Sequence, residues 1–493
     1  MSEPLRPEGI PVHVGDVVLT TPGLSGEAEV HPPASPGMRS AEVATVDLQE
    51  ALAGADLQEQ LTVEIAGPAE LDDRGGSRAG GGGNEITVEV PGPGEGNGQV
   101  LLYAAEDGSL TWHYPDSVLP EEVATRGGER RTYRIPRAVV APEAAEGTSR
   151  GLLGALGSKL LKVLVFPLLE PALGRAANTF ASRWEARNRP ALVRWYGPDT
   201  ALLASTESTP LTREDWRSLR DRPVLLLVHG TFSSARGGFG AMPVETLSAL
   251  HGRYQGRVLA WEHPSVSLTP RENVGWLAGE LREARGLTLD VVTHSRGGLV
   301  GRALAERGRE LGLDASIRVR TLVMVAPPNA GTALADKQHV RALLDRVTNL
   351  VQFVPSAGVG DVLGPVLEVV KQVAVGAFGG LEGIMSMDPG GEELRDFNRS
   401  PGTDAAYRVI TAEFEPPPGS SLGRIARDAG TDLVFGRVAN DLVVPTQGAW
   451  DLPDTQGFPV TERLVLDASL GVDHGTFFGR EDVGHRLLEW LPG

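Results

Sequence analysis

The chain has 493 residues, of which 41% are hydrophobic and 22% are charged, and its formal net charge is −18. This composition is typical of globular proteins and excludes a mainly disordered chain, and the length predicts two or three domains. The acidic balance argues against a general nucleic-acid partner because no segment concentrates Lys and Arg, and the lack of cysteine excludes disulfides and thiolate chemistry. The N-terminus has no basic region followed by an apolar stretch, so we expect no secretory signal and a cytoplasmic location.

Residues 1–145 predict a mainly-β domain of unknown role. Short β-branched or alternating runs recur and are separated by turn-forming residues, at 12–19, 61–65, 86–90, 100–104, 110–114 and 133–135. The glycine-rich stretch 75–83 predicts a flexible loop and lacks the Lys-Ser/Thr ending of a phosphate loop. Trp112, His113 and Tyr114 are interpreted as packed strand residues in preference to a binding surface.

Residues 146–221 predict an apolar helical linker. The stretch 151–169 is strongly apolar, but Lys159, Lys162, Glu170 and proline residues interrupt it, which argues against a membrane span. A packed linker helix and a support for the β domain are two interpretations. The third is an interfacial helix giving peripheral membrane or lipid-surface contact, which we favour less because only two cations support it.

From about residue 222 the pattern changes to alternating strands and helices. The apolar run that begins at Val224 is typical of a strand buried on both faces and ends in His229-Gly230-Thr231-Phe232. A helix at 244–254, a strand at 257–262, a helix at 274–285 and strands at 287–292 and 319–326 follow. This alternation predicts a mostly parallel sheet with right-handed crossovers.

Ser295 lies between the strand at 287–292 and a helical pattern that begins at Gly297. A serine at such a strand-to-helix turn is typical of a nucleophile elbow, written G-x-S-x-G. Here Thr293 replaces the first glycine, so we expect a wider or tilted turn, whereas Gly297 keeps the other side of the turn open.

Motifs in this region carry a family resemblance. They are Val228-His-Gly-Thr231, Val292-Thr-His-Ser-Arg-Gly-Gly298 and Ala326-Pro-Pro-Asn-Ala-Gly-Thr332. In this order they resemble the lipase- or esterase-like α/β hydrolases, over roughly residues 222–493. The resemblance implies an α/β-hydrolase fold with a central, mostly parallel sheet and a helical lid, here preceded by the small mainly-β domain.

The resemblance also implies a catalytic triad in the chain order serine, acid, histidine. Ser295 would be the nucleophile, Asp441 the acid in a loop similar to the family's Asp-x-x-Val-Pro, and His474 the base in the loop before the last helix. The alternatives are His339 and His485 for the base, and Asp336, Asp432 and Asp473 for the acid.

The oxyanion hole implied by the resemblance needs two backbone N–H donors. One is expected from Arg296, the residue after the nucleophile, and the other from Thr231 or Phe232. Gly230 lets the backbone approach closely, and His229 is interpreted as structural. No cofactor or metal ion is expected.

Residues 335–400 are expected to form a helical cap with helices at 340–354 and 362–375 and hinges at Gly358, Gly360, Gly379 and Gly380. Either a mobile lid or a static cap implies an apolar acyl-ester or lipid substrate. The sequence therefore predicts a serine hydrolase of carboxylic esters, with lipid or acyl esters as the expected substrates. The alternatives are an acyltransferase, thioesterase or amidase with the same residues, a metal-dependent lipase, and a binding protein on a hydrolase scaffold.

Overall fold

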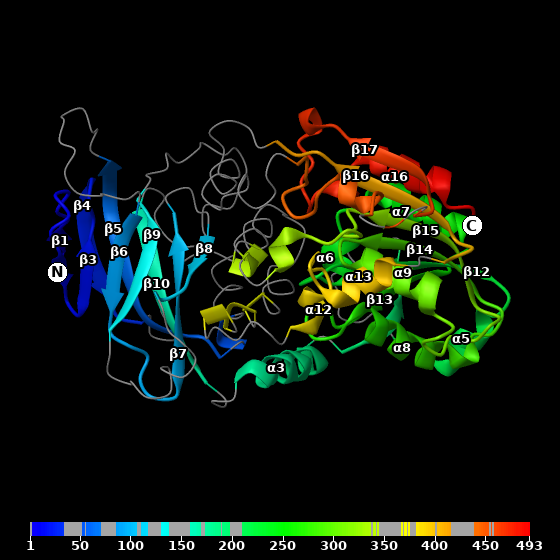
Figure 1. Ribbon diagram of the computed structural model, residues 1–493, viewed down its shortest axis with the longest axis horizontal. Helices are drawn as coiled ribbons and strands as arrows, with labels where there is room; N and C mark the ends of the chain where they lie inside the picture. The colour runs from blue at the N-terminus through cyan, green and yellow to red at the C-terminus, as the bar shows by residue number, and fades with distance from the viewer. Residues whose placement is uncertain are drawn as a thin grey trace. The chain divides into compact units, whose positions relative to one another are not determined.

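The chain forms two compact units in the computed structural model (Figure 1). One unit contains residues 1–177 and 366–379, and the other contains residues 178–365 and 380–493. We call them the β unit and, after the fold that the sequence resemblance implies, the hydrolase unit. The structure describes residues 2–33, 52–54, 56–70, 85–105, 110–116, 130–137, 158–168, 173–188, 190–197, 210–336, 339–341, 343–344, 366–367, 369–371, 373–374, 381–399, 402–415, 438–452, 455 and 458–493.

The β unit is built on two sheets. Its strands are β1 (Glu3–Pro4), β2 (Val12–Val14), β3 (Val17–Thr20), β4 (Leu24–His31), β5 (Gln58–Glu70), β6 (Glu85–Val90), β7 (Asn97–Ala104), β8 (Leu110–His113), β9 (Arg131–Pro136) and β10 (Ser158–Pro167). The larger sheet has the order β1-β4-β5-β10-β7-β8, and the smaller has the order β2-β3-β6-β9. Inward side chains of both sheets, among them Val17, Val63, Ile86 and Tyr133, form one core. The strands expected in residues 1–145 are present, and the glycine-rich stretch 75–83 lies outside the described residues.

The helix predicted from the apolar stretch 151–169 is wrong for its described part. Residues Ser158–Pro167 form β10, which lies between β5 and β7 and is antiparallel to both. Its β-branched residues suit a buried central strand better than a helix, and Leu161, Val163, Leu164 and Phe166 are buried. These four apolar side chains, which belong to the stretch that suggested a lipid-surface contact, are therefore buried in the β unit. Within the described residues, no helix is long and apolar enough to cross a membrane.

The expected cap at 335–400 divides between the two units. The helical residues around 366–374 group with the β unit, where Val366, Val369 and Val370 are fully buried. The other described parts, α12 (Glu382–Met385) and α13 (Glu392–Asn398), belong to the hydrolase unit. The expected hinge glycines at 358, 360, 379 and 380 lie outside the described residues.

The hydrolase unit contains one seven-stranded sheet of order β11-β13-β12-β14-β15-β16-β17. The strands are β11 (Leu192–Trp195), β12 (Pro223–Val228), β13 (Val258–Glu262), β14 (Thr288–His294), β15 (Arg318–Val325), β16 (Ala406–Ala412) and β17 (Val460–Leu466). Only the edge strand β11 is antiparallel to its neighbour. The predicted α/β-hydrolase fold is confirmed in this unit, and the unit begins before residue 222, because β11 completes the sheet.

Helices lie before, between and after these strands in the chain. They are α3 (Leu173–Asn188), α5 (Arg213–Ser218), α6 (Ala235–Phe239), α7 (Val244–Arg253), α8 (Pro270–Glu280), α9 (Gly297–Arg307), α12, α13 and α16 (Glu481–Trp490). The short 3₁₀ turns are η1 (Leu281–Glu283), η2 (Ala333–Ala335), η4 (Gln447–Ala449), η5 (Ala468–Leu470) and η6 (Phe477–Gly479).

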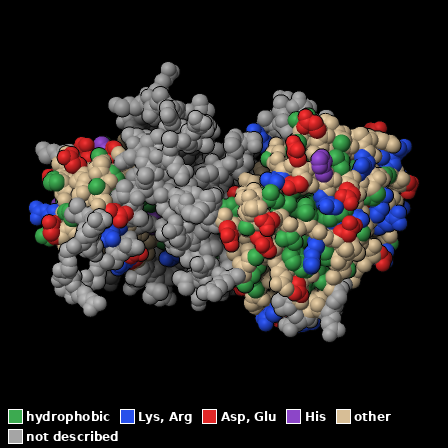
Figure 2. All heavy atoms as spheres, turned by 90° about the horizontal axis from the view of Figure 1, so that it is seen from above, with side chains coloured by type: hydrophobic (Ala, Val, Ile, Leu, Met, Phe, Trp, Pro, Cys, Tyr) green, Lys and Arg blue, Asp and Glu red, His purple; other side chains and the backbone are tan. Residues whose placement is uncertain are grey.

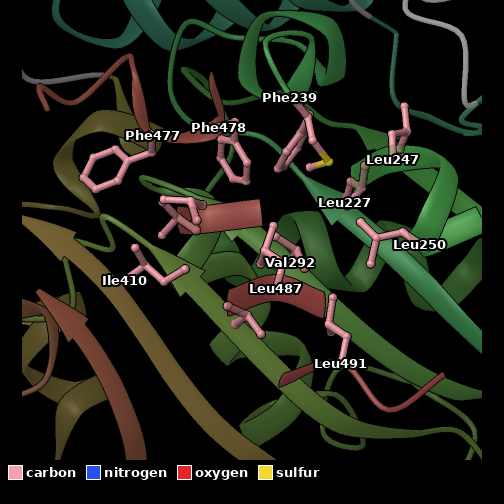
Figure 3. Close-up of a cluster of buried hydrophobic side chains, with 14 of the residues drawn as sticks. Leu227, Phe239, Leu247, Leu250, Val292, Ile410, Phe477, Phe478, Leu487 and Leu491 are labelled. Atoms are coloured by element: carbon pink, nitrogen blue, oxygen red, sulfur yellow. The ribbon is translucent and has the colours of Figure 1, made fainter. Parts of the chain in front are cut away.

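A single apolar cluster holds α7 and α16 against one face of the sheet (Figure 3). Leu227 and Val292 from central strands meet Leu250 of α7 and Leu487 of α16 in this cluster. Residues that alternate with them along β12 and β14 are also buried, so both faces of these strands are covered. This packing fixes the carboxyl ends of β12 and β14, where the candidate site lies.

Candidate active site

Ser295 occupies a tight turn between β14 and α9. Its φ of 54° is in the left-handed region, which non-glycine residues rarely adopt. The turn is held by the Ser295 N–H, which donates to the Val325 carbonyl at 2.9 Å, and by the Gly298 N–H, which donates to the Ser295 carbonyl at 2.8 Å. The strained backbone presents the serine side chain at the carboxyl edge of the sheet, as in a nucleophile elbow.

Thr293 is accommodated in this turn by the helix that follows it, and the wider or tilted turn expected from this threonine stays a prediction. Thr293 is fully buried, and the space for its methyl group comes from Gly301, one turn further along α9. A Cβ at position 301 would lie 2.9 Å from Thr293 Cγ2 and 2.7 Å from Leu322 Cδ1. The missing side chain at 301 therefore compensates for the added one at 293.

Gly297 and Gly230 lie where other atoms approach the backbone too closely to leave room for a side chain. A Cβ at Gly297 would lie 2.5 Å from the Val228 carbonyl oxygen, and a Cβ at Gly230 would lie 2.7 Å from Ser295 Cβ. Real Cβ atoms essentially never approach other heavy atoms so closely. The two glycines thus let the turn after β12 and the elbow after β14 lie in contact.

Ser295, His474 and Asp441 form one hydrogen-bonded chain. The distance from Ser295 Oγ to His474 Nε2 is 2.9 Å, and that from His474 Nδ1 to Asp441 Oδ2 is 2.8 Å. The three residues are buried, with exposed fractions of 6%, 8% and 0%. A carboxylate on Nδ1 holds the histidine in the tautomer whose Nε2 can accept a proton from the serine.

Asp441 is fixed by its own loop. Its Oδ1 accepts the Val443 N–H at 3.0 Å and the Val444 N–H at 2.7 Å, which leaves Oδ2 to bind His474. The neighbouring Asn440 side chain spans the same loop, accepting the Leu442 N–H and donating to the Val438 carbonyl.

The alternative residues lie elsewhere. Asp336 binds His339 at 2.6 Å, His485 is exposed on α16, and the Asp473 carboxylate accepts the Gly475 N–H. Burial raises the pKa of Asp473 above its usual value. Asp432 lies outside the described residues.

His294 supports the histidine loop from the residue before the serine. Its Nε2 lies 2.9 Å from the carbonyl oxygen of His474, and the two rings lie 5.1 Å apart. Burial lowers the pKa of His294 to about 3. The ring is therefore neutral at ordinary pH, and its Nε2–H donates to the backbone of His474.

The expected oxyanion donors occupy the turn after β12 and the start of α9. The Phe232 N–H is already bound to Ser265 Oγ at 3.2 Å, and Phe232 has a φ of 56°. By contrast, the backbone N–H groups of Thr231 and Arg296 have no hydrogen-bond partner among the residues that the structure describes. The geometry thus favours Thr231 over Phe232 as the first donor.

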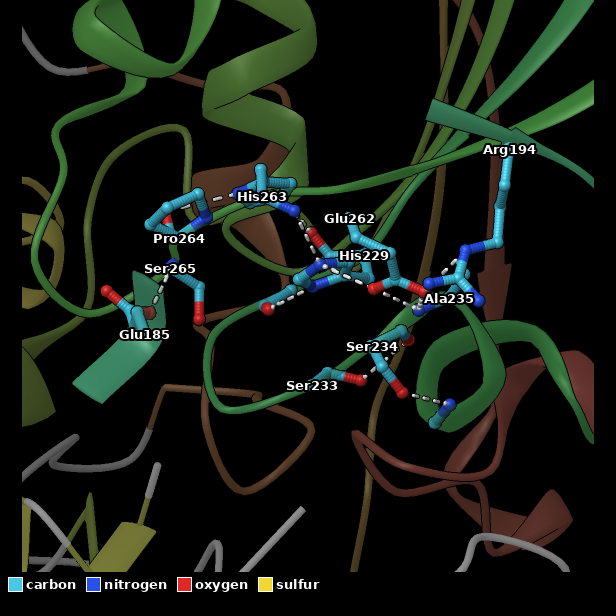
Figure 4. Close-up of polar contacts among 12 residues, drawn as sticks. Glu185, Arg194, His229, Ser233, Ser234, Ala235, Glu262, His263, Pro264 and Ser265 are labelled. Atoms are coloured by element: carbon cyan, nitrogen blue, oxygen red, sulfur yellow. Dashed lines mark hydrogen bonds and ion pairs between the residues drawn. The ribbon is translucent and has the colours of Figure 1, made fainter. Parts of the chain in front are cut away.

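A buried polar cluster lies behind this turn (Figure 4). His229 Nδ1 lies 2.9 Å from the Gly230 carbonyl oxygen, and its Nε2 accepts the His263 N–H at 3.2 Å. The rings of His229 and His263 stack at 4.2 Å, and burial lowers the pKa of His263 well below its usual value. Glu262 accepts the Ala235 N–H at the start of α6.

Arg296 is expected to use its backbone N–H as an oxyanion donor, whereas its side chain points into the protein. It is fully buried, with Nε donating to the Gly383 carbonyl at 2.7 Å and a second guanidinium nitrogen donating to the Leu268 carbonyl. Burial lowers the pKa of Arg296 to about 10, which leaves it charged at neutral pH. Arg296 therefore connects the elbow to α12 and to the loop after β13.

Some residues of this site could not be foreseen from motifs. His294 was detectable only as a neighbour of the serine, whereas Gly301 and Ser265 carry no family signature. Within the described residues, no group of three or more His, Asp or Glu side chains is arranged to hold a metal ion.

Comparison with known proteins places the hydrolase unit in a family. Residues 188–492 match DUF7379, described as a domain of unknown function. The chain belongs to the DUF7379 family. No curated protein matches the chain.

Solved structures to which the chain is similar include two lipases and a protein named EstA. The mature lipase BlEst2 of Bacillus licheniformis is 19% identical, with a TM-score of 0.33, over 54% of this chain and 92% of its own. Lipase 1 of Pelosinus fermentans is 16% identical, with a TM-score of 0.36, over 55% of this chain and 96% of its own. EstA of Clostridium botulinum is 12% identical, with a TM-score of 0.38, over 64% of this chain and 97% of its own. Similarities of this degree say nothing about substrate.

Proposed function

We propose that this DUF7379 protein is a serine hydrolase that cleaves carboxylic esters, with acyl or lipid esters as the substrate class. The observation that carries the proposal is the hydrogen-bonded chain from Ser295 through His474 to Asp441 at a left-handed elbow. A serine that only capped a helix would need neither partner.

In the proposed reaction, Ser295 Oγ attacks the ester carbonyl while His474 Nε2 takes the hydroxyl proton. The same proton then passes to the leaving alcohol, and an acyl-enzyme forms. A water molecule, activated by His474, releases the acid and restores the serine. Asp441 orients the imidazole and stabilises its charged form.

The backbone N–H groups of Thr231 and Arg296 are the proposed donors to the oxyanion. Each such donor contributes about 2.7–4 kcal/mol to the lowering of the barrier in known hydrolases. We call the turn after β12, residues 229–232, the oxyanion turn. Thr231 Oγ1 lies 3.8 Å from Met387 Sδ, so an apolar side chain borders this turn. This neighbour supports an apolar acyl group as the part of the substrate beside Ser295.

The test is labelling of the full chain with a fluorophosphonate, which reacts with activated serines. Wild type should be labelled, Ser295→Ala should not, and a matched variant of an exposed serine, Ser469→Ala, should be labelled as wild type is. Ester hydrolysis should fall roughly 10⁵–10⁶-fold in Ser295→Ala, as when other serine triads lose the nucleophile. An unlabelled wild type would contradict the proposal.

Rates on p-nitrophenyl esters of increasing chain length, together with thioester and amide analogues, distinguish the related activities. We expect esters to be the best substrates and longer acyl chains to lower KM. Faster transfer to an added alcohol than to water would instead identify an acyltransferase.

A further inference from the structure

Glu185 is a buried carboxylate on α3 that binds a loop of the hydrolase unit. Its exposed fraction is 2%. One oxygen, Oε1, accepts the N–H groups of Ser265 at 2.7 Å and Val266 at 3.0 Å. The other, Oε2, accepts the N–H of Ser267 at 2.9 Å and its hydroxyl at 2.5 Å. Both oxygens of a buried charge are thus satisfied, which is the condition under which such a charge is tolerated.

Figure 4 shows Glu185 beside Ser265, and the loop that carries Ser265 is in direct contact with the oxyanion turn through Phe232. Ser265 Oγ accepts the Phe232 N–H, which holds the peptide between Thr231 and Phe232. The preceding peptide is held by His229 at the Gly230 carbonyl. Because the C=O and N–H of a trans peptide point in opposite directions, fixing the Gly230 carbonyl sets the direction of the Thr231 N–H.

The same loop binds the second proposed donor through the Arg296 side chain. Arg296 donates to the Leu268 carbonyl and, through Nε, to Gly383. The Gly383 N–H in turn donates to the Val266 carbonyl at 3.0 Å, and a Cβ at 383 would lie 2.6 Å from the Ser265 carbonyl oxygen. Residues 265–268 therefore contact the oxyanion turn on one side and the residue after Ser295 on the other.

We infer that Glu185 is a positioning residue for oxyanion stabilisation, acting through the loop at 265–267. The inference rests on the proposed serine hydrolase function. Glu185 precedes residue 188, where the family match begins, and α3 starts within the β unit and ends within the hydrolase unit. A helix that lies mostly upstream of the family match thus supplies a group on which the site depends.

The number of donors explains why a carboxylate is needed. Glu185→Gln keeps one carbonyl oxygen that can accept the N–H groups of Ser265 and Val266. Its amide NH₂ would face the Ser267 N–H, so the hydrogen bond from Ser267 is lost and two donors repel each other. Glu185→Ala leaves three buried backbone N–H groups without their acceptor. The loop should then shift and release Ser265 from Phe232.

The experiment compares full-length wild type, Glu185→Ala, Glu185→Gln and Arg183→Ala, which is exposed on the same helix. It measures kcat and KM on a p-nitrophenyl ester, the Ki of a trifluoromethyl ketone that forms an oxyanion with the serine, and the pH dependence of kcat/KM. We expect kcat to fall roughly 30- to 300-fold in Glu185→Ala and roughly 3- to 10-fold in Glu185→Gln, a sizeable part of one oxyanion donor's effect. KM should change less than about twofold, because ground-state binding is not altered.

Two readouts separate positioning from a general structural effect. The Ki of the ketone should rise in parallel with the fall in kcat/KM, since both depend on the oxyanion. The pH profile should keep its wild-type midpoints, because Ser295, His474 and Asp441 are untouched. Arg183→Ala should match wild type in all measurements. If Glu185→Ala does not fold, Glu185→Gln gives the same tests.

The outcomes are distinguishable. A wild type that reacts with fluorophosphonate, together with folded Glu185 variants of unchanged kcat and Ki, overturns the inference alone. A fall in kcat with a shifted pH profile and an unchanged Ki likewise overturns the inference alone. A wild type that neither reacts with fluorophosphonate nor binds the ketone overturns the proposed function, and the inference with it.

Discussion

At the residue scale, positions 293 and 301 near the elbow share one limited space, so the size of one side chain limits the size of the other. Position 293 carries a threonine where the usual pattern has glycine, and position 301 carries the glycine that makes room for it. The fit is apolar only, because Thr293 Oγ1 is buried without a hydrogen-bond partner in the described residues. A buried hydroxyl without a partner costs about 1–3 kcal/mol.

Thr293→Val should therefore raise the free energy of unfolding of the hydrolase unit by about 1 kcal/mol, because it removes an unsatisfied hydroxyl and keeps the shape. The matched control is Thr332→Val. Thr332 is equally buried, but its hydroxyl donates to the Val443 carbonyl at 2.5 Å, so this change should lower stability by about 1–2 kcal/mol. Urea denaturation of the full chain measures both. A loss of stability in Thr293→Val would mean that its hydroxyl is satisfied in solution.

The residues of the candidate site differ in how far the sequence could predict them. Ser295, Asp441 and His474 are separated in the chain by 146 and 33 positions, yet short motifs and chain order selected them. Thr231 could not be distinguished from Phe232, because the choice depends on the hydrogen bond that the Phe232 N–H donates to Ser265 Oγ. Glu185 acts 80 positions away through backbone N–H groups, which any residue type supplies, so no sequence pattern could indicate it.

At the scale of elements, β10 shows where periodicity fails. A central strand is apolar on both faces, so its residues do not alternate, and a run of Leu and Val with occasional Lys also suits a helix. The lysines are accommodated inside the β unit. Lys162 donates to Glu59 Oε2 at 2.8 Å, and Lys159 donates to the Tyr103 hydroxyl at 2.8 Å. Such partners come from other strands and cannot be read from the segment itself.

The α9 helix is anchored by a buried ion pair. Arg302 donates to Glu306 Oε1 at 2.8 Å and to Asn398 Oδ1 at 2.8 Å, and its guanidinium lies close to the rings of Phe397 and Phe458. The side chains of Arg302 and Glu306 are both fully buried. Through its contacts with Asn398 and Phe397, Arg302 also connects α9 to α13.

Arg302→Ala should lower the free energy of unfolding by about 3–5 kcal/mol, because it leaves the Glu306 carboxylate buried without its cation. The double variant Arg302→Met with Glu306→Met should be considerably more stable than Arg302→Ala, since hydrophobic replacement of both partners removes the unpaired charge. Denaturant unfolding of both variants checks this. Equal losses in the single and double variants would mean that aromatic packing, not the charge, is what matters at Arg302.

At the scale of the whole molecule, the chain carries a formal net charge of −18. On the face drawn in Figure 2, acidic and basic side chains of the hydrolase unit are interspersed. A face of this kind exerts little electrostatic steering on a charged partner. This is consistent with a substrate recognised mainly by its apolar part.

The buried histidines make the stability of the hydrolase unit depend on pH. Burial lowers the pKa of His294 to about 3 and that of His263 well below 6.5, so in the folded state both stay neutral where the unfolded chain is protonated. Between the folded and unfolded pKa values the unfolded chain binds more protons, and stability therefore rises with pH. This stability is fully present above about pH 6.5 and is lost as the pH falls toward about 3, the pKa of His294 in the folded state.

Removing one of these histidines should therefore flatten the pH dependence. Between pH 6.5 and pH 4, the free energy of unfolding should fall by up to about 1.4 kcal/mol per pH unit for each buried histidine. His294→Gln keeps an N–H donor for the His474 carbonyl but cannot be protonated, so its slope should be smaller by the contribution of one group. His485→Gln, at an exposed position on α16, should keep the wild-type slope. Urea denaturation at several pH values measures these slopes, and equal slopes in wild type and His294→Gln would contradict the neutral, buried state of His294.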